Sequence, residues 1–245
     1  MRMPSVLTIN LHRYQRNLEI LGSLLSPGAQ ICAVVKADAY GHGVMEVAKT
    51  LLDNGVSRLA VSMLDEAIQL RNNGIKVPIL VLSYTDPARA LEIIQNDITQ
   101  TVFSHDLAEA LSKAAVKLRK NVKIHVKVDT GMTRVGFMPG YSAVKNIVRI
   151  SKLPGIIIEG LFTHFAVADE ADKSYTYMQF ERFMSVCSEL GRIGIHLPVK
   201  HVCNSAALIK FPEMHLDMVR PGIILYGLYP SSEVDRTKIN LKPAM

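Results

Sequence analysis

The stretch ICAVVKADAYGHG, residues 31–43, joins a run of apolar residues to a lysine, a tyrosine and two glycines. The apolar run is typical of a strand in a parallel sheet whose two faces are both covered. Lys36 follows the run directly, although lysine is rarely buried without a partner. Two interpretations are open: its stem packs at the rim while the ammonium reaches water, or its amine is a nucleophile for a carbonyl group.

Similar apolar runs recur along the chain, separated by amphipathic stretches that predict helices. Strands are predicted at 31–36, 58–62, 77–82, 99–103, 122–128, 157–164, 199–203 and 216–227. Parallel strands require such crossovers, so the eight runs favour a TIM-type (β/α)8 barrel. A helix from Leu11 to Leu25 would fill the place left by a missing last helix. An open doubly wound sheet is the alternative, because periodicity does not distinguish closed from open sheets.

Polar residues mark where several of these helices begin. Asn10, Ser62 and Ser104 each precede an amphipathic stretch and are predicted N-caps. Glu66 would lie in the first turn of the helix after Ser62, where negative charge is favourable. The stretch SYTYMQFERFMSVCSEL is predicted to end as a helix at Gly191.

Composition restricts the class of protein. Hydrophobic residues make up 49% of the chain and the mean hydropathy is +0.18, which indicates a filled core. The apolar runs fall short of the ~18 residues that span a bilayer, and no secretory signal is recognisable. Three scattered cysteines fit reduced thiols, so a cytoplasmic location is expected. The net charge of +6 is spread without blocks, so neither a nucleic acid nor a membrane is an expected partner.

The two ends of the sequence do not fit a self-contained barrel. Residues 6–10, VLTIN, are predicted as a short strand without a slot in the barrel, and INLKPAM resembles the start of another strand. We therefore expect residues 1–10 to belong with a β-rich domain outside this sequence and residues 11–235 to form the barrel. Residues 236–245 would begin that domain, which would be truncated here.

Functional groups of a TIM barrel lie at the carboxyl ends of its strands. At the last two predicted strands, Ser205 offers a hydroxyl where a helix begins and Gly222 lets the backbone approach an anion. A plain helix cap and a simple bend are the alternative interpretations. Because barrels of this type bind phosphate at these strands, and Lys36 ends the first one, pyridoxal 5'-phosphate (PLP) is a fitting cofactor.

Two other candidates admit a structural and a functional interpretation. Arg134 is either a solvated turn residue or a guanidinium fork for a carboxylate or phenolate. His164 is either a hydrogen-bonded rim residue or a catalyst. No metal site is predicted, because His196 and His201 lack ligand spacing and no cysteine or carboxylate cluster joins them.

Five segments carry a family resemblance: AVVKADAYGHG, KVDTGMTRVGF, THFAVAD, NSAA and VRPGIILYG. In order and spacing they resemble the signature segments of the bacterial alanine racemases, which are PLP-dependent enzymes of fold type III. The resemblance runs from about residue 6 to the last residue. It implies interconversion of L-alanine and D-alanine for the cell wall, with a homodimer as the full-length enzyme.

The resemblance also implies roles for the matched residues. Lys36 would bind PLP and act as one of two catalytic bases. The cofactor-binding residues would be Lys36, Tyr40, Leu82, His164, Asn204, Ser205, Arg220, Gly222 and Ile223, with Tyr40, Ser205, Gly222 and Ile223 at the phosphate.

Four charged or polar residues complete the implied site. Arg134 would place the substrate carboxylate and contact the phenolic oxygen of PLP. Lys127 would orient Arg134, and the matching lysine is carbamylated in many members of the family. Arg220 would face the pyridine nitrogen, with His164 bonded to it from behind. Lys36, Arg134, His164 and Arg220 are thus the implied catalytic residues.

Racemisation requires an acid and a base on opposite faces of a planar intermediate. In the family the second base is a tyrosine of the partner subunit's β-domain, and no residue here matches it. We therefore expect this chain to bind PLP but to racemise alanine poorly or not at all. A non-catalytic PLP-homeostasis barrel and a serine racemase of the same family are the alternatives.

Overall fold

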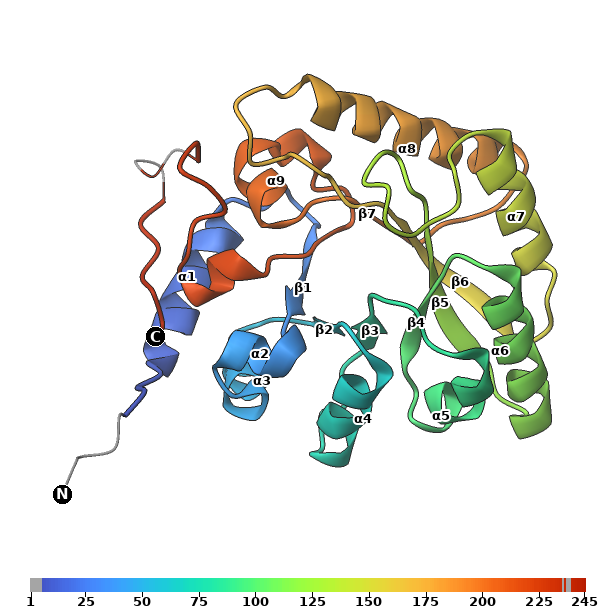
Figure 1. The fold of residues 1–245 in the computed structure, drawn as a ribbon, viewed down its shortest axis with the longest axis horizontal. Coiled ribbons are helices and arrows are strands. Elements are labelled where there is room, and N and C mark those ends of the chain that lie inside the picture. Colours follow the sequence, from blue (N-terminus) through green and yellow to red (C-terminus); the bar gives the residue numbers. More distant parts are fainter. Residues whose placement is uncertain (1–5, 235, 237–238) are drawn as a thin grey trace.

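The computed structural model describes residues 6–234, 236 and 239–245, and its strands form one parallel sheet of eight (Figure 1). The strands are β1 (Gln30–Val34), β2 (Arg58–Val61), β3 (Ile79–Val81), β4 (Thr99–Val102), β5 (Val122–Lys127), β6 (Ile156–Phe162), β7 (Val199–His201) and β8 (Met218–Val219). Their order is β7-β6-β5-β4-β3-β2-β1-β8, so the last strand pairs with the first.

Backbone hydrogen bonds also join the two edge strands. The N–H of Asp217 donates to the carbonyl of Lys200 (3.1 Å), and the N–H of Arg220 donates to that of Cys203 (2.9 Å). The sheet therefore returns on itself as a nearly closed TIM-type barrel, and the predicted fold class is confirmed over the open sheet.

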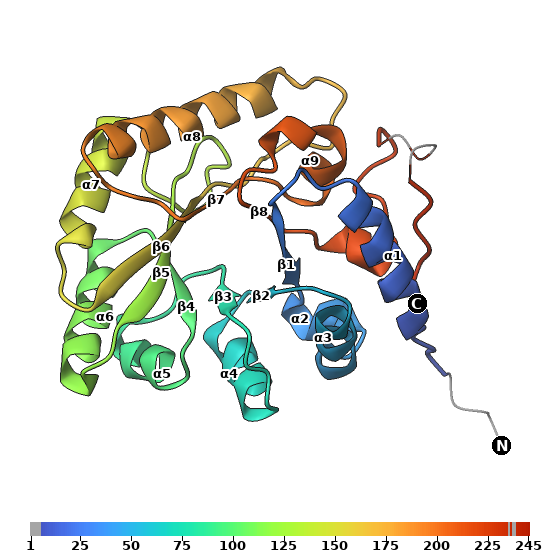
Figure 2. The same ribbon diagram turned by 180° about the vertical axis from the view of Figure 1, so that it is seen from behind.

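Helices surround the strands on the outside of the barrel (Figures 1 and 2). They are α1 (Leu11–Ser23), α2 (Lys36–Gly41), α3 (Val44–Asp53), α4 (Leu64–Asn72), α5 (Ala90–Gln95), α6 (His105–Leu118), α7 (Tyr141–Ser151), α8 (Ser174–Arg192) and α9 (Ser205–Lys210), with 3-10 turns η1 (Pro87–Arg89), η2 (Pro212–Met214) and η3 (Ile223–Tyr226). The predicted leading helix, α1, packs against α3 and η3 and so occupies the place beside β8. Of the described helices, none has the length and apolar character needed to cross a membrane.

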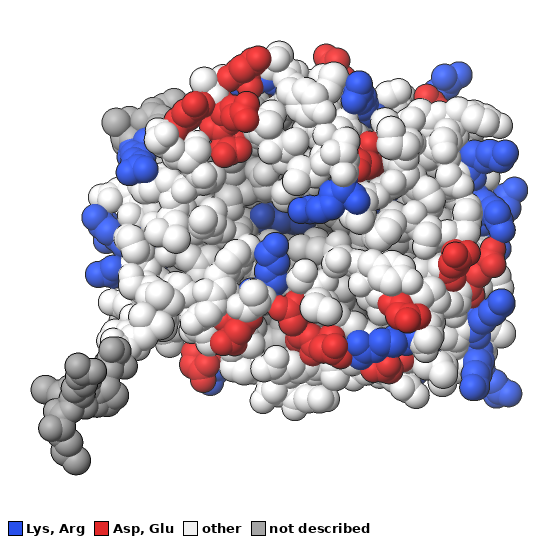
Figure 3. Space-filling view, viewed as in Figure 1, with Lys and Arg blue, Asp and Glu red and all other residues white. Residues whose placement is uncertain are grey.

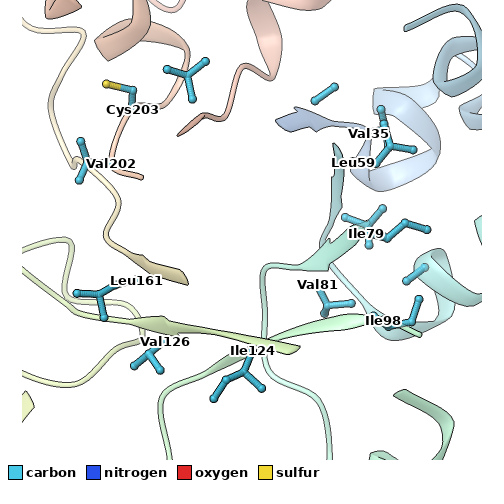
Figure 4. Close-up of a cluster of buried hydrophobic side chains, with 14 of the residues drawn as sticks. Val35, Leu59, Ile79, Val81, Ile98, Ile124, Val126, Leu161, Val202 and Cys203 are labelled. Carbon is cyan, nitrogen blue, oxygen red and sulfur yellow. The ribbon is translucent and has the colours of Figure 1, made fainter. Parts of the chain in front are cut away.

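Two apolar clusters fill the molecule. The larger one lies between strands and helices, and Figure 4 shows part of it, including Leu59, Ile124 and Leu161. The smaller one lies on the other face of β1, β2, β3 and β8 and consists of Cys32, Val34, Ala60, Leu80 and Met218. Alternation along each strand explains the division, because successive side chains point to opposite faces of the sheet.

Several predicted boundaries are wrong. The strand predicted at 216–227 is only Met218–Val219, because Pro221 lacks an N–H and η3 begins at Ile223. Residues 6–10 and 239–245 have no strand, and the latter run beside α1, where the Asn17 side chain bonds both backbone groups of Lys242. Whether these ends belong with a further domain stays a prediction.

Candidate active site

A cavity of about 560 Å³ opens at the carboxyl ends of the strands, and every residue predicted for the site lines it. These residues are Lys36, Tyr40, Leu82, Lys127, Arg134, His164, Asn204, Ser205, Arg220, Gly222 and Ile223. Figure 3 shows a hollow near the middle of this face with basic side chains in it. Their common location is a finding, whereas the individual roles stay predictions.

Lys36 does not end a strand as predicted. β1 stops at Val34, and Lys36 begins α2, in which Ala37 to Tyr40 all have left-handed backbone angles, with φ between 52° and 54°. Such a conformation costs an L-residue roughly 1–2 kcal/mol. The turn brings Tyr40 back to the same cavity, with the Lys36 Nζ 6.0 Å from the centroid of its ring.

Glu66, on α4, holds this unusual turn to the next βα unit. One carboxylate oxygen accepts the N–H of Ala37 (2.5 Å), and the other accepts those of Ser62 (2.7 Å) and Met63 (2.8 Å). The N-cap of α4 is Met63 and not the predicted Ser62, and Glu66, three residues further along, accepts the N–H of this N-cap residue. At α6 the predicted cap is confirmed, since the Ser104 hydroxyl accepts the N–H of Leu107 (3.5 Å).

Ser205, Gly222 and Tyr40 form one end of the cavity. The N–H of Gly222 donates to the Ser205 hydroxyl (2.9 Å), which joins the loops after β7 and β8. A Cβ atom on Gly222 would lie 2.9 Å from the Tyr40 hydroxyl oxygen, so only glycine leaves this space open. Two hydroxyl groups beside an open glycine fit an anionic group such as the phosphate of PLP.

The loop that carries Arg134 is organised by Asp129. Its carboxylate accepts the N–H groups of Gly131 (3.1 Å), Thr133 (2.9 Å) and Arg134 (2.9 Å). Burial alone would raise the pKa of Asp129, but these three donors outweigh burial and lower it. A Cβ atom on Gly136 would lie 2.5 Å from the Asp129 backbone nitrogen, so a side chain at this position would break the loop.

Lys127 is buried beneath this loop. Its Nζ has no hydrogen-bond partner among the residues that the structure describes. Burial lowers the pKa of Lys127 to about 8, and the positive charge of Arg220 is the next largest cause. The predicted orienting contact with Arg134 is thus not formed by the bare amine. A lysine that readily loses its proton is the nucleophile that carbamate formation needs, so the site fits that modification.

Arg220 is 4% exposed and reaches the cavity from the end of β8. Its guanidinium donates to the His201 Nδ1 (2.7 Å), the Thr163 carbonyl (2.8 Å) and, at 3.4 Å, the His164 Nδ1. Burial and the charge of Arg220 hold the pKa of His164 well below its ordinary value, so His164 is a neutral acceptor. The predicted contact with His164 is present, but His201 is the closer partner.

Sequence reasoning missed two residues behind Arg220. His201 was weighed only as a metal ligand, although alternation along β7 places it on the inner face beside Val199. Phe162 stacks on its ring, with centroids 4.7 Å apart and planes inclined by 5°, and also lines the cavity. The cavity further contains Asp169, the last residue of the segment THFAVAD, to which sequence reasoning assigns no role.

Residues 9–230 match the family model described as alanine racemase, N-terminal domain. Alanine racemases of Methanococcus maripaludis and Clostridium tetani are 52% and 49% identical over 97% of this chain. The chain spans 64% and 61% of the length of these two relatives.

Solved structures of alanine racemases also superpose on this chain. Alanine racemase of Clostridium difficile 630 in complex with cycloserine superposes with a TM-score of 0.97 at 45% identity, covering 100% of this chain and 67% of that one. For alanine racemase of Bacillus anthracis with bound L-Ala-P the TM-score is 0.91 at 34% identity, covering 99% and 64%.

Proposed function

Because the chain belongs to the alanine racemase N-terminal domain family, we propose that it is the PLP-binding barrel of an enzyme that interconverts L-alanine and D-alanine. The observation that carries this proposal is the single cavity in which the Lys36 amine, a hydroxyl-and-glycine cradle and the buried Arg220 meet. With the family, we propose a cytoplasmic homodimer for the full-length protein, whose D-alanine supplies the cell wall.

When bound, PLP supplies an electron sink for the reaction at the Cα of the amino acid. Lys36 would hold the cofactor covalently and move a proton at Cα on one face. Tyr40 and Ser205 would bind the phosphate, where Gly222 leaves room for it. Arg134 would orient the substrate carboxylate, since its planar guanidinium matches that group.

Arg220 would donate a hydrogen bond to the ring nitrogen of the cofactor. A guanidinium does not give up its proton in practice, so it disfavours a second positive charge on that nitrogen. Burial lowers the pKa of Arg220 to about 10, which still leaves the group charged at neutral pH. Arg220 would thereby limit electron withdrawal by the ring, which favours rapid return of the proton to Cα over side reactions.

The opposite face of the substrate needs a second base. The family resemblance gives this role to a tyrosine of the partner subunit, and the one tyrosine among the described cavity residues, Tyr40, is assigned to the phosphate. We therefore place the second base outside these residues, which makes the 245-residue chain weakly active or inactive by itself. D-alanine formed from L-alanine by the purified chain at the rate of a complete racemase would contradict this assignment.

Covalent trapping tests the central claim. The chain is mixed with PLP, reduced with borohydride and digested, and the labelled peptide is identified by mass spectrometry. We expect the label on Lys36 and its loss in Lys36→Arg, with full labelling in Lys49→Arg, a matched control at an exposed lysine of α3. Label on another lysine would overturn the proposal. Incubation with alanine or with serine before the borohydride is added would distinguish the two substrates, because the amino acid that the site accepts would compete with Lys36 for the cofactor and lower the labelling.

A further inference from the structure

The barrel interior contains a row of buried polar side chains whose far end the proposed function does not use. From the cavity inward, Arg220 contacts His201 (2.7 Å), and His201 Nε2 contacts His125 Nδ1 (2.7 Å). His125 Nε2 contacts Glu159 (3.0 Å), whose carboxylate also receives the Arg58 guanidinium (2.6 Å). Barrel interiors are ordinarily filled by branched apolar residues, so a row of ionisable groups requires an explanation.

The chemistry of the end groups fixes the direction of every bond. A guanidinium can only donate, so the Nδ1 of His201 is unprotonated and accepts. His201 then carries its proton on Nε2 and donates it to Nδ1 of His125. His125 in turn carries its proton on Nε2 and donates to Glu159, which as a carboxylate can only accept. The row is therefore a one-directional chain with two neutral imidazoles of the same tautomer.

The electrostatics agree with this assignment. Burial lowers the pKa of His125 and, more strongly, that of His201, so both rings are neutral near pH 7. For Glu159, burial would raise the pKa, but the hydrogen bonds from His125 and Arg58 outweigh it and lower the pKa. The far end of the chain is thus a carboxylate that carries its charge.

The strand geometry is built around this row. A register shift on the β5–β6 pair aligns Ile124 with Ile158 but His125 with Gly160, which leaves Glu159 as the extra residue. Such bulges re-aim side chains, and here the bulge brings Glu159 to His125. A Cβ atom on Gly160 would lie 2.6 Å from the His125 Nδ1, so glycine at this position makes the room that the ring occupies.

We propose that Glu159 and the two histidines are positioning residues: together they form a one-directional hydrogen-bond chain that holds the Arg220 guanidinium at the cavity. The acceptors of Arg220 are uncharged carbonyls and imidazole nitrogens. A buried cation without a counter-charge is costly. The hydrogen-bond chain links this cation through two imidazoles to Glu159, a carboxylate that also pairs with Arg58 and Lys123, and fixes the plane in which the guanidinium faces the ligand. The expected effect on PLP binding rests on the proposed function, whereas the hydrogen-bond chain does not depend on it.

Measurement of the histidine tautomers tests the hydrogen-bond chain directly and needs no cofactor. Selective ¹⁵N labelling of histidine in the 245-residue chain lets NMR distinguish protonated from unprotonated ring nitrogens, with His125→Asn and His201→Asn spectra for assignment. We expect both rings to be neutral at pH 7 with the proton on Nε2. A proton on Nδ1 of either ring would overturn the proposal.

A pair of matched variants tests the positioning role. Glu159→Gln removes the charge at the end of the chain, whereas Glu109→Gln makes the same change in an exposed ion pair with Arg149. We expect Glu159→Gln to shift the ¹⁵N signals of both histidines and to weaken PLP binding about tenfold, the effect of one charge-assisted hydrogen bond. Glu109→Gln should do neither. Unchanged histidine signals in Glu159→Gln would overturn the proposal.

Gly160→Ala provides a second perturbation that keeps every charge. Its Cβ would press on the His125 nitrogen that accepts from His201, so the signals of both rings should change and PLP binding should weaken. Histidine signals and a PLP affinity equal to those of the wild type in this variant would contradict the proposed hydrogen-bond chain. If the wild-type protein shows the expected histidine tautomers but does not bind PLP, the result would contradict the proposed function and would still support the hydrogen-bond chain.

Discussion

Replacing Lys127 by methionine removes a buried amine and keeps most of the length of the side chain. The amine has no hydrogen-bond partner among the described residues, and its pKa is lowered from 10.5 to about 8. Each unit of lowered pKa corresponds to about 1.4 kcal/mol, so the protonated amine lowers the free energy of unfolding by roughly 3 kcal/mol. We therefore expect Lys127→Met to be more stable than the wild type at pH 7 by an amount of that order.

The pH dependence has a defined sign. Between about pH 8 and pH 10.5 the amine of Lys127 is neutral in the folded chain and protonated in the unfolded chain. The unfolded state then binds more protons, so wild-type stability rises with pH across this window. The advantage of Lys127→Met should consequently be largest below pH 8 and disappear above pH 10.5.

Urea denaturation at a series of pH values measures this difference. The buffers must be free of CO2, because a carbamate on Lys127 would replace the positive charge by a negative one. Lys113→Met, at an exposed position of α6, is the matched control and should show no such pH-dependent difference. Equal stability of Lys127→Met and wild type at pH 7 would refute the reasoning, because the buried ammonium would then carry no penalty.

Three further substitutions test the parts that shape the cavity. Glu66→Gln leaves one carbonyl oxygen for three backbone N–H groups, so we expect a loss of about 2 kcal/mol in urea denaturation and slower borohydride trapping of Lys36. Gly136→Ala places a Cβ 2.5 Å from a backbone nitrogen at φ 138° and should lower stability by at least ~2 kcal/mol, whereas Gly191→Ala, with open space around it, should not. Gly222→Ala fills the space beside Tyr40 and should weaken PLP binding in fluorescence titration; unchanged affinity would contradict the phosphate assignment.

The barrel was predictable from sequence because its signal is local. Eight apolar runs separated by amphipathic helices need only the two periodicities of strand and helix to be recognised. The run at 223–226 shows the limit of that signal, since IILY has strong strand character but forms a 3-10 turn after Pro221. The hydrogen bond from the Gly222 N–H to the Ser205 hydroxyl joins residues that follow two different strands, so local sequence preference does not predict it.

The turn after Lys36 could not be predicted for a related reason. Alanine, aspartate and tyrosine do not favour left-handed backbone angles, and four such residues in succession contradict any propensity scale. The turn persists because tertiary contacts hold it, among them the bond between the Ala37 N–H and Glu66 on α4. The histidine chain likewise depends on a bulge at Glu159, which the pattern of β6 does not reveal.

The charges of the cavity connect these observations. Lys36, Lys127, Arg134 and Arg220 line it, and Asp169 is the single carboxylate among the lining residues that the structure describes. Cations this close disfavour one another, and the lowered pKa of Lys127, after burial, reflects the charges of Arg220 and Arg134. A ligand with a phosphate and a carboxylate supplies the missing negative charge where the backbone leaves room for it. The same cations that repel one another in the barrel would therefore stabilise it once such a ligand binds, because binding to the folded state alone adds stability.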